Sequence, residues 1–177
     1  MILGRDVVRR SRHARNEVRE LLQSVFVAEL IRPSKELWLV SPWLSDIEVI
    51  DDTAGAFASI VRGTLNTSLT LSAALALLAA AGTGVHVVTR PVDSQNFCDA
   101  LNRHLAHSPH KDQVTLRTVQ TLHTKGLVGD DYRVMGSMNF TFNGIRINDE
   151  IIRFDRNAEA VARMRLEFEQ QYGDANA

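Results

Sequence analysis

The stretch HTKGLVGDDYRVMGSMNFTFNGIRINDE, residues 123–150, decides the fold of this chain and holds its reactive groups. Two short apolar runs flank the turn signal Gly129-Asp130-Asp131, a pattern that predicts an antiparallel hairpin. Because alternate residues of a strand share a face, such a hairpin would gather polar side chains at one place. These side chains stand two residues apart in each run: His123 with Lys125, and Ser137 with Asn139.

These residue types suit an attack on a phosphodiester. A neutral His123 is the expected nucleophile, and its attack on phosphorus would give a covalent phosphohistidine. Lys125 would neutralise the non-bridging oxygens, while Asn139 and Ser137 would donate hydrogen bonds to the charge that grows in the transition state. Glu150 would orient an imidazole and stabilise its charged form. Together with Asp130 of the expected turn, these five residues form the candidate catalytic set.

Two candidate catalytic residues have a structural alternative. Asp130 sits in the expected hairpin turn, and we favour a role in fixing the loop over contact with substrate. Ser137 follows Gly136, so shaping the turn is as good an interpretation as donating to substrate. The scheme requires no cofactor and no divalent metal, and the sequence has no dense carboxylate cluster to hold one.

Residues 121–154 resemble the HKD motif of the phospholipase D superfamily, H-x-K-x(4)-D followed by G-S-x-N. They are most similar to the short bacterial nucleases of that superfamily, in which G-S-x-N-F-T and a downstream N-x-E recur. Here five residues rather than the usual six separate Asp130 from Gly136, a difference that a tighter hairpin absorbs. The resemblance extends over residues 35–120 and implies an α/β fold, a phospholipase-D-like mixed β-sheet flanked by helices on both faces. Residues 37–46 also resemble a segment of phospholipase-D-like proteins associated with bacterial 7-deazaguanine DNA-modification systems, which favours a DNA substrate.

The chain carries one HKD copy. Single-copy members of the superfamily build their site at a twofold dimer interface, so the resemblance implies a homodimer with a shared site. The chemistry agrees, because one histidine cannot be the nucleophile and the protonated general acid in the same half-reaction. A second copy of His123 would supply the acid, and the resemblance assigns Glu150 to the imidazole of the dimer mate.

The bulk composition sets few limits on function. At 177 residues the chain is expected to fold as a single domain, residues 1–177. A net charge of −1 indicates neither nucleic acid nor membrane as a partner. The longest apolar run, residues 73–81, is too short to span a bilayer, and charged residues interrupt any signal-peptide shape at the N-terminus. Together with the lone Cys98, this predicts a cytoplasmic protein.

Hydrophobic periodicity predicts the remaining elements. Helices are expected at residues 5–31, from residue 70 or 72 to 81, and at 94–107 and 157–172. Strands are expected at 36–40, 85–89, 114–119 and 150–154, in addition to the two motif strands. Residues 46–67 fit no regular pattern and are interpreted as an irregular connection.

Trp43 and Arg146 are candidate substrate-binding residues. Trp43 follows a strand end, where ligand-lining residues tend to lie; we favour core packing, and stacking on a base is the alternative. Trp38 is expected in the core.

His104, His107 and His110 stand three residues apart and resemble a zinc set. Pro109 interrupts the helix there, so a solvated surface is favoured. The arginines of residues 5–19 suit DNA phosphates, although the acidic residues among them make a plain solvated face at least as good an interpretation.

The sequence therefore predicts a metal-independent phosphodiesterase, a nuclease acting on DNA. A lipid phosphodiesterase is one alternative, against which the single HKD copy and the expected lack of a membrane-binding segment count. The other is a DNA-binding or assembly subunit of a DNA modification or defence system with little activity alone. The near-neutral charge leaves that alternative open.

Overall fold

The computed structural model describes residues 4–8, 12–52, 68–146 and 150–173. Its strands and helices follow one another as β1 (Gly4–Val8), α1 (Arg12–Ile31), β2 (Glu36–Val40), β3 (Glu48–Ile50), β4 (Leu69–Thr70), α2 (Leu71–Ala80), β5 (Gly84–Thr89), α3 (Gln95–Leu105), the 3₁₀ turn η1 (Lys111–Gln113), β6 (Val114–Thr118), β7 (Gly126–Val128), β8 (Arg133–Gly136), α4 (Phe142–Arg146), β9 (Ile151–Asp155) and α5 (Ala158–Tyr172). No helix within these ranges has both the length and the apolar character needed to cross a membrane.

One mixed sheet organises the molecule, with seven strands in the order β1-β9-β8-β7-β2-β5-β6. β2, β5 and β6 run parallel to one another, whereas the other neighbouring pairs are antiparallel. β3 and β4 form a separate antiparallel pair. The predicted hairpin is present, because β7 pairs antiparallel with β8. This arrangement places the two motif strands between β2 and β9.

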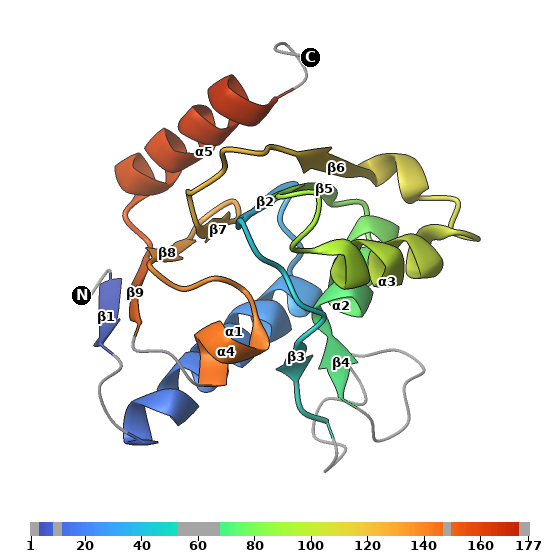
Figure 1. Cartoon of the computed structure of the whole chain (residues 1–177). Coiled ribbons are helices and arrows are strands. Elements are labelled where there is room, and N and C mark those ends of the chain that lie inside the picture. Colours follow the sequence, from blue (N-terminus) through green and yellow to red (C-terminus); the bar gives the residue numbers. More distant parts are fainter. Residues whose placement is uncertain (1–3, 9–11, 53–67, 147–149, 174–177) are drawn as a thin grey trace.

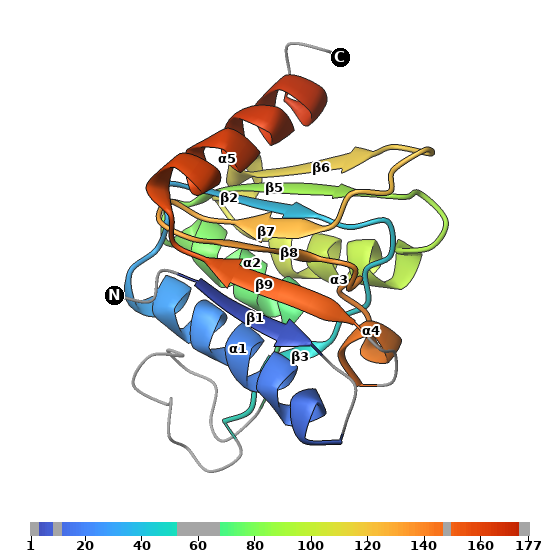
Figure 2. The same cartoon turned by 90° about the vertical axis from the view of Figure 1, so that its left-hand side faces the viewer.

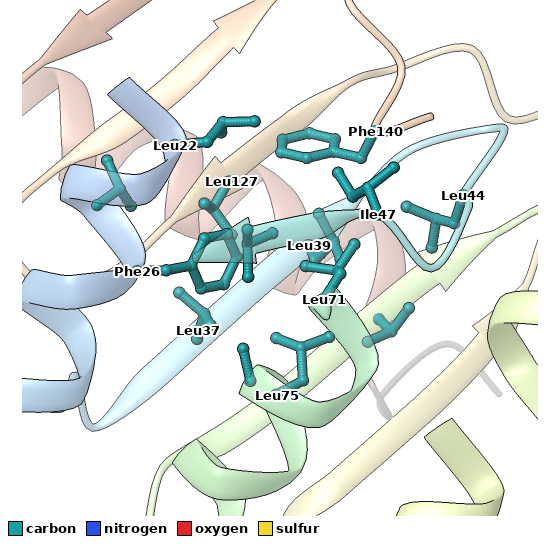
Figure 3. Close-up of a cluster of buried hydrophobic side chains, with 14 of the residues drawn as sticks. Leu22, Phe26, Leu37, Leu39, Leu44, Ile47, Leu71, Leu75, Leu127 and Phe140 are labelled. Atoms are coloured by element: carbon teal, nitrogen blue, oxygen red, sulfur yellow. The ribbon is translucent and has the colours of Figure 1, made fainter. Parts of the chain in front are cut away.

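Helices cover both faces of the sheet, with α1, α2 and α3 on one side and α5 on the other (Figures 1 and 2). The alternation along β2 explains why both faces need cover. Leu37 and Leu39 pack into the larger apolar cluster with the three helices, whereas Trp38 and Val40 pack into the cluster below α5. Figure 3 shows part of the larger cluster, where Phe26 of α1 and Leu75 of α2 meet these leucines. The predicted α/β architecture is confirmed, and so is the buried position of Trp38.

The N-terminus departs from the prediction of a helix over residues 5–31. Residues 4–8 form β1, which pairs antiparallel with β9 from Gly4 opposite Asp155 to Val8 opposite Ile151, and the helix begins only at Arg12. An edge strand exposes unpaired N–H and C=O groups, and the β-branched pair Val7-Val8 suits a strand that satisfies them. Pairing with a distant strand thus overrides the local helical pattern.

Smaller differences concern the connections. Part of the segment that fitted no pattern, Glu48–Ile50, forms β3, which pairs with β4 just beyond that segment; residues 53–67 lie outside the described ranges. α4 was not predicted, since five residues carry too little periodicity to reveal a helix. The motif strands are shorter than expected: β7 begins one residue after Lys125, and β8 ends one residue before Ser137. The candidate catalytic residues therefore lie just beyond the strand ends.

Candidate active site

Five sheet strands bring polar residues to one edge of the sheet. The register aligns the end of β2 with the start of β7 (Val40 opposite Gly126) and the end of β8 with the start of β9. β5 ends at the same edge, because it runs parallel to β2. The residues just beyond these five strand ends are Ser41, Arg90, Lys125, Ser137 and Glu150.

His123 lies at this edge with an exposed side chain. The backbone around it is held at two points. The preceding residue, Leu122, is buried in the cluster below α5, and its carbonyl accepts a hydrogen bond from Arg90 Nε at 3.0 Å. The carbonyl of His123 accepts one from Lys125 Nζ at 2.7 Å. The imidazole is thus open to solvent on a fixed segment.

Lys125 lies between a positive and a negative group. Partial burial lowers the pKa of its ammonium, the carboxylate of Glu150 opposes this shift, and the guanidinium of Arg90 adds to it. Glu150 and Arg90 therefore each lie within electrostatic range of Lys125. A cation held in this way suits the non-bridging oxygens of a phosphate.

Ser137 is tied to β9. Its hydroxyl donates to Glu150 Oε2 and accepts from the backbone N–H of Ile151 at 3.1 Å, while its own N–H donates to the Ile151 carbonyl at 3.0 Å. Glu150 is 7% exposed, so this contact fixes a buried carboxylate beside Lys125. The single hydroxyl proton of Ser137 is used to orient Glu150, so it is not directed toward a substrate.

Asn139 is buried behind the same edge. Its Oδ1 lies 3.4 Å from the hydroxyl of Ser41, which donates its single proton to the carbonyl of Trp43 at 2.9 Å. The backbone N–H of Phe140 also lies 3.4 Å from the Ser41 hydroxyl. Ser41 therefore connects the loop after β2 with the loop after β8.

Asp130 lies at the opposite end of the hairpin. Its Oδ2 accepts from the backbone N–H of Lys35 at 2.8 Å, and its Oδ1 accepts from Arg165 Nη2 at 3.2 Å. The backbone N–H of Asp130 donates to Ser34 Oγ at 2.9 Å. The carboxylate thus ties the hairpin turn to the start of β2 and to α5, a geometry that matches the loop-fixing interpretation.

The remaining candidates divide. Trp43 is 45% exposed, so the expectation that it packs in the core is wrong. Arg146 ends α4, but its side chain lies outside the described residues. His104, His107 and His110 are exposed, and the described part of the chain holds no group of three or more potential metal-ligating side chains.

Sequence reasoning missed Arg90 and Ser41. Both follow strands, β5 and β2, whose parallel pairing places their carboxyl ends side by side. The rule that ligands approach the carboxyl ends of parallel strands singled out Trp43 and would also have singled out Arg90, which directly follows Thr89.

Residues 28–172 match the family model described as "Cardiolipin synthase, PLD-like domain". No sequence among the curated proteins matches the chain. The fold is similar to that of NucT from Helicobacter pylori, with a TM-score of 0.61, 13% identity and 94% of each chain covered. It is also similar to Nuc from Salmonella typhimurium, a phospholipase D family member, with a TM-score of 0.58, 19% identity, and 95% of this chain and 93% of that chain covered. TrmBL2, an archaeal chromatin protein, shares the fold at a TM-score of 0.56 and 10% identity over 96% of this chain and 51% of its own.

Proposed function

The chain belongs to the phospholipase D superfamily of phosphodiesterases, and we propose that it is a metal-independent nuclease that cuts DNA through a covalent phosphohistidine at a site shared by two copies of the chain. One observation carries the proposal: an exposed imidazole at His123 lies at the same sheet edge as Lys125, Asn139 and Glu150. These groups match the candidate catalytic set of the HKD motif.

The reaction divides into two displacements. A nitrogen of neutral His123 attacks phosphorus, a P–N bond forms, and the leaving oxygen departs with a proton from the imidazolium of a second His123. Water then attacks phosphorus, the second imidazole takes its proton, and the P–N bond breaks. Lys125 and Asn139 stabilise the negative charge on the non-bridging oxygens in both steps.

A second copy of the chain is needed to provide the second imidazole. Among the other histidines whose side chains are described, His86 lies near the other end of β5, His104 lies in the last turn of α3, and His107 and His110 follow that helix. His123 therefore has no described partner of its own kind at this edge. A twofold axis beside His123 would bring two copies of it together.

An exposed apolar surface beside the site supports self-association. Val134 and Ile152 point into the larger apolar cluster, on the face of the sheet that α1 covers. Their strand neighbours Met135 and Ile151 therefore point to the opposite face. Met135 is 37% exposed and Ile151 is 55% exposed; Ile151 directly follows Glu150, and Met135 lies two residues before Ser137. Burying such side chains in a dimer would stabilise it.

Cleavage is tested with purified protein in excess EDTA on three substrates: bis(p-nitrophenyl) phosphate, DNA and phosphatidylcholine vesicles. We expect turnover of the first two. His123→Ala should abolish it, whereas the matched control His107→Ala, which removes an exposed histidine remote from the site, should not. Strict dependence on added magnesium or manganese would point to metal-activated water instead. An electrophoretic shift of DNA without cleavage would favour a binding subunit, and cleavage of the vesicles alone a lipid phosphodiesterase.

The shared site is tested by mixing wild type with His123→Ala and allowing subunits to exchange. If both imidazoles are needed, activity per total protein falls as the square of the wild-type fraction, to about a quarter at an equal mixture. A linear fall to about a half, or full activity in a monomer under sedimentation, would refute the shared site.

A further inference from the structure

We propose that Trp43 and Arg90 form a subsite for the nucleotide next to the scissile phosphate, in which the indole stacks on the base and the guanidinium binds the neighbouring phosphate. The proposal rests on the nuclease function above and adds a substrate-binding element to it. The starting point is an apolar ring that the fold holds outside the core: Trp43 is 45% exposed, whereas Trp38 is 3% exposed.

Buried hydroxyl groups fix the loop that carries Trp43. The carbonyl of Trp43 accepts from the hydroxyl of Ser41 at 2.9 Å, and the backbone N–H of Leu44 donates to Ser94 Oγ at 2.9 Å. Ser94 Oγ in turn lies 2.5 Å from Thr89 Oγ1. All three hydroxyl-bearing residues are at most 1% exposed, and Leu44 is buried in the core. An exposed ring on a loop this well anchored loses little entropy when a ligand stacks on it.

Arg90 connects the ring with the segment that carries His123. Its guanidinium carbon lies 5.9 Å from the centroid of Trp43, within cation–π range, and its Nε donates to the Leu122 carbonyl, one residue before His123. Its backbone N–H donates to the Pro42 carbonyl at 3.2 Å. Within the described part of the chain, no hydrogen bond or ion pair uses its Nη1 or Nη2, which leaves both available to a phosphate.

The location defines the ligand chemistry. Arg90 is close enough to Lys125 to lower the pKa of that ammonium, so a phosphate on Arg90 and one on Lys125 would belong to the same strand. An indole beside a guanidinium matches the alternation of base and phosphate in a nucleic-acid strand, and stacking accepts any base. Bis(p-nitrophenyl) phosphate has one phosphate and no nucleobase, so it cannot occupy both positions.

Binding is measured first, in the His123→Ala background, so that the result does not depend on catalysis. The probes are a single-stranded oligothymidylate and an abasic deoxyribose-phosphate strand of the same length. Trp43→Ala should weaken binding of oligothymidylate at least about fivefold more than binding of the abasic strand. Arg90→Ala should weaken both and lower the salt dependence of binding by about one phosphate contact. Trp43→Phe provides a second variant if Trp43→Ala does not fold, because it keeps an aromatic ring in the loop.

Intrinsic fluorescence gives an independent readout, because the chain has two tryptophans and Trp38 is buried. Oligothymidylate should quench the emission of the His123→Ala protein, and this quenching should disappear when Trp43 is replaced by Phe. In the active enzyme, the ratio of kcat/KM for the oligonucleotide to that for bis(p-nitrophenyl) phosphate should fall at least about fivefold in Trp43→Ala.

The outcomes separate the two proposals. Base-dependent binding at Trp43, together with a wild-type protein that cleaves nothing, would support the subsite and refute the nuclease. Turnover with an unchanged substrate ratio in Trp43→Ala would support the nuclease and refute the subsite. Equal weakening of both strands by Trp43→Ala, no effect of Arg90→Ala, or binding of duplex alone would also overturn the subsite.

Discussion

Replacing Asp130 by Ala should reduce stability far more than catalysis. The change removes two hydrogen bonds to a carboxylate, one from the Lys35 N–H at 2.8 Å and one from Arg165 Nη2 at 3.2 Å. Hydrogen bonds to charged groups contribute about 1.5–3 kcal/mol each, but the side chain of Asp130 is 36% exposed and water can replace part of the loss. Arg165 also keeps its bond to the Gly129 carbonyl. We therefore expect a loss of about 2 kcal/mol in the free energy of unfolding, or about 4–8 °C in Tm.

The assay is urea and thermal unfolding at one fixed protein concentration, together with kcat on bis(p-nitrophenyl) phosphate well below the unfolding transition. Asp131→Ala is the matched control, since that carboxylate pairs with Arg156 at 2.8 Å on the surface, with both side chains more than half exposed. Such a pair contributes less than about 1 kcal/mol. Asp130→Asn should lose about half as much as Asp130→Ala, because its amide oxygen still accepts from Lys35. A fall in kcat of about 10²-fold or more with unchanged stability would refute the anchoring role and return Asp130 to the catalytic set.

Two further predictions use other parts of the site. Gly136→Ala should destabilise the protein by about 2–4 kcal/mol in urea unfolding, because the new Cβ would lie 1.9 Å from the Ile151 carbonyl oxygen. Gly82→Ala is the control for backbone strain alone, since Gly82 has a φ of +99° and its new Cβ would meet no atom within 4 Å. It should cost only about 1 kcal/mol. Glu150→Gln should move the alkaline limb of kcat/KM to lower pH, because Glu150 raises the pKa of Lys125 and the active form of Lys125 is protonated. Arg90→Ala should move the limb to higher pH, and shifts in the same direction in the two variants would contradict this account of the site.

Most of the fold follows from local patterns in the sequence. The continuous apolar run at 37–40 identifies β2, and the Gly-bounded helix before β5 has its predicted position. What failed was β1, where five residues with a helical pattern join a strand more than a hundred residues away. Pairing of this kind depends on which edge the rest of the sheet leaves open, and no local pattern records that.

The site divides in the same way. His123, Lys125, Ser137, Asn139 and Glu150 share one hairpin and its neighbour strand, so their convergence could be predicted from spacing and turn chemistry. Arg90 and Ser41 reach the same edge only through the parallel pairing of β2 with β5. The exposure of Trp43 depends on the buried hydroxyl groups that hold its loop, and a pattern of apolar residues cannot distinguish an indole held outward from one packed inward.

The two ends of the hairpin have separate physical roles, and this explains why one motif combines such different residues. At the turn, Asp130 accepts from the start of β2 and from α5, so the far end of the hairpin is fixed to a neighbouring strand and to the helix on one face of the sheet. At the open end, the backbone at Leu122 and His123 is held by Arg90 and Lys125, while the imidazole remains exposed. Preorganised catalytic groups require a support that does not move when charge develops, and β7 supplies one because it is paired on both sides, with β2 and β8. The aspartate of the motif would then act on the reaction only through the position of the strand, which is why its removal should be measured in unfolding before it is measured in turnover.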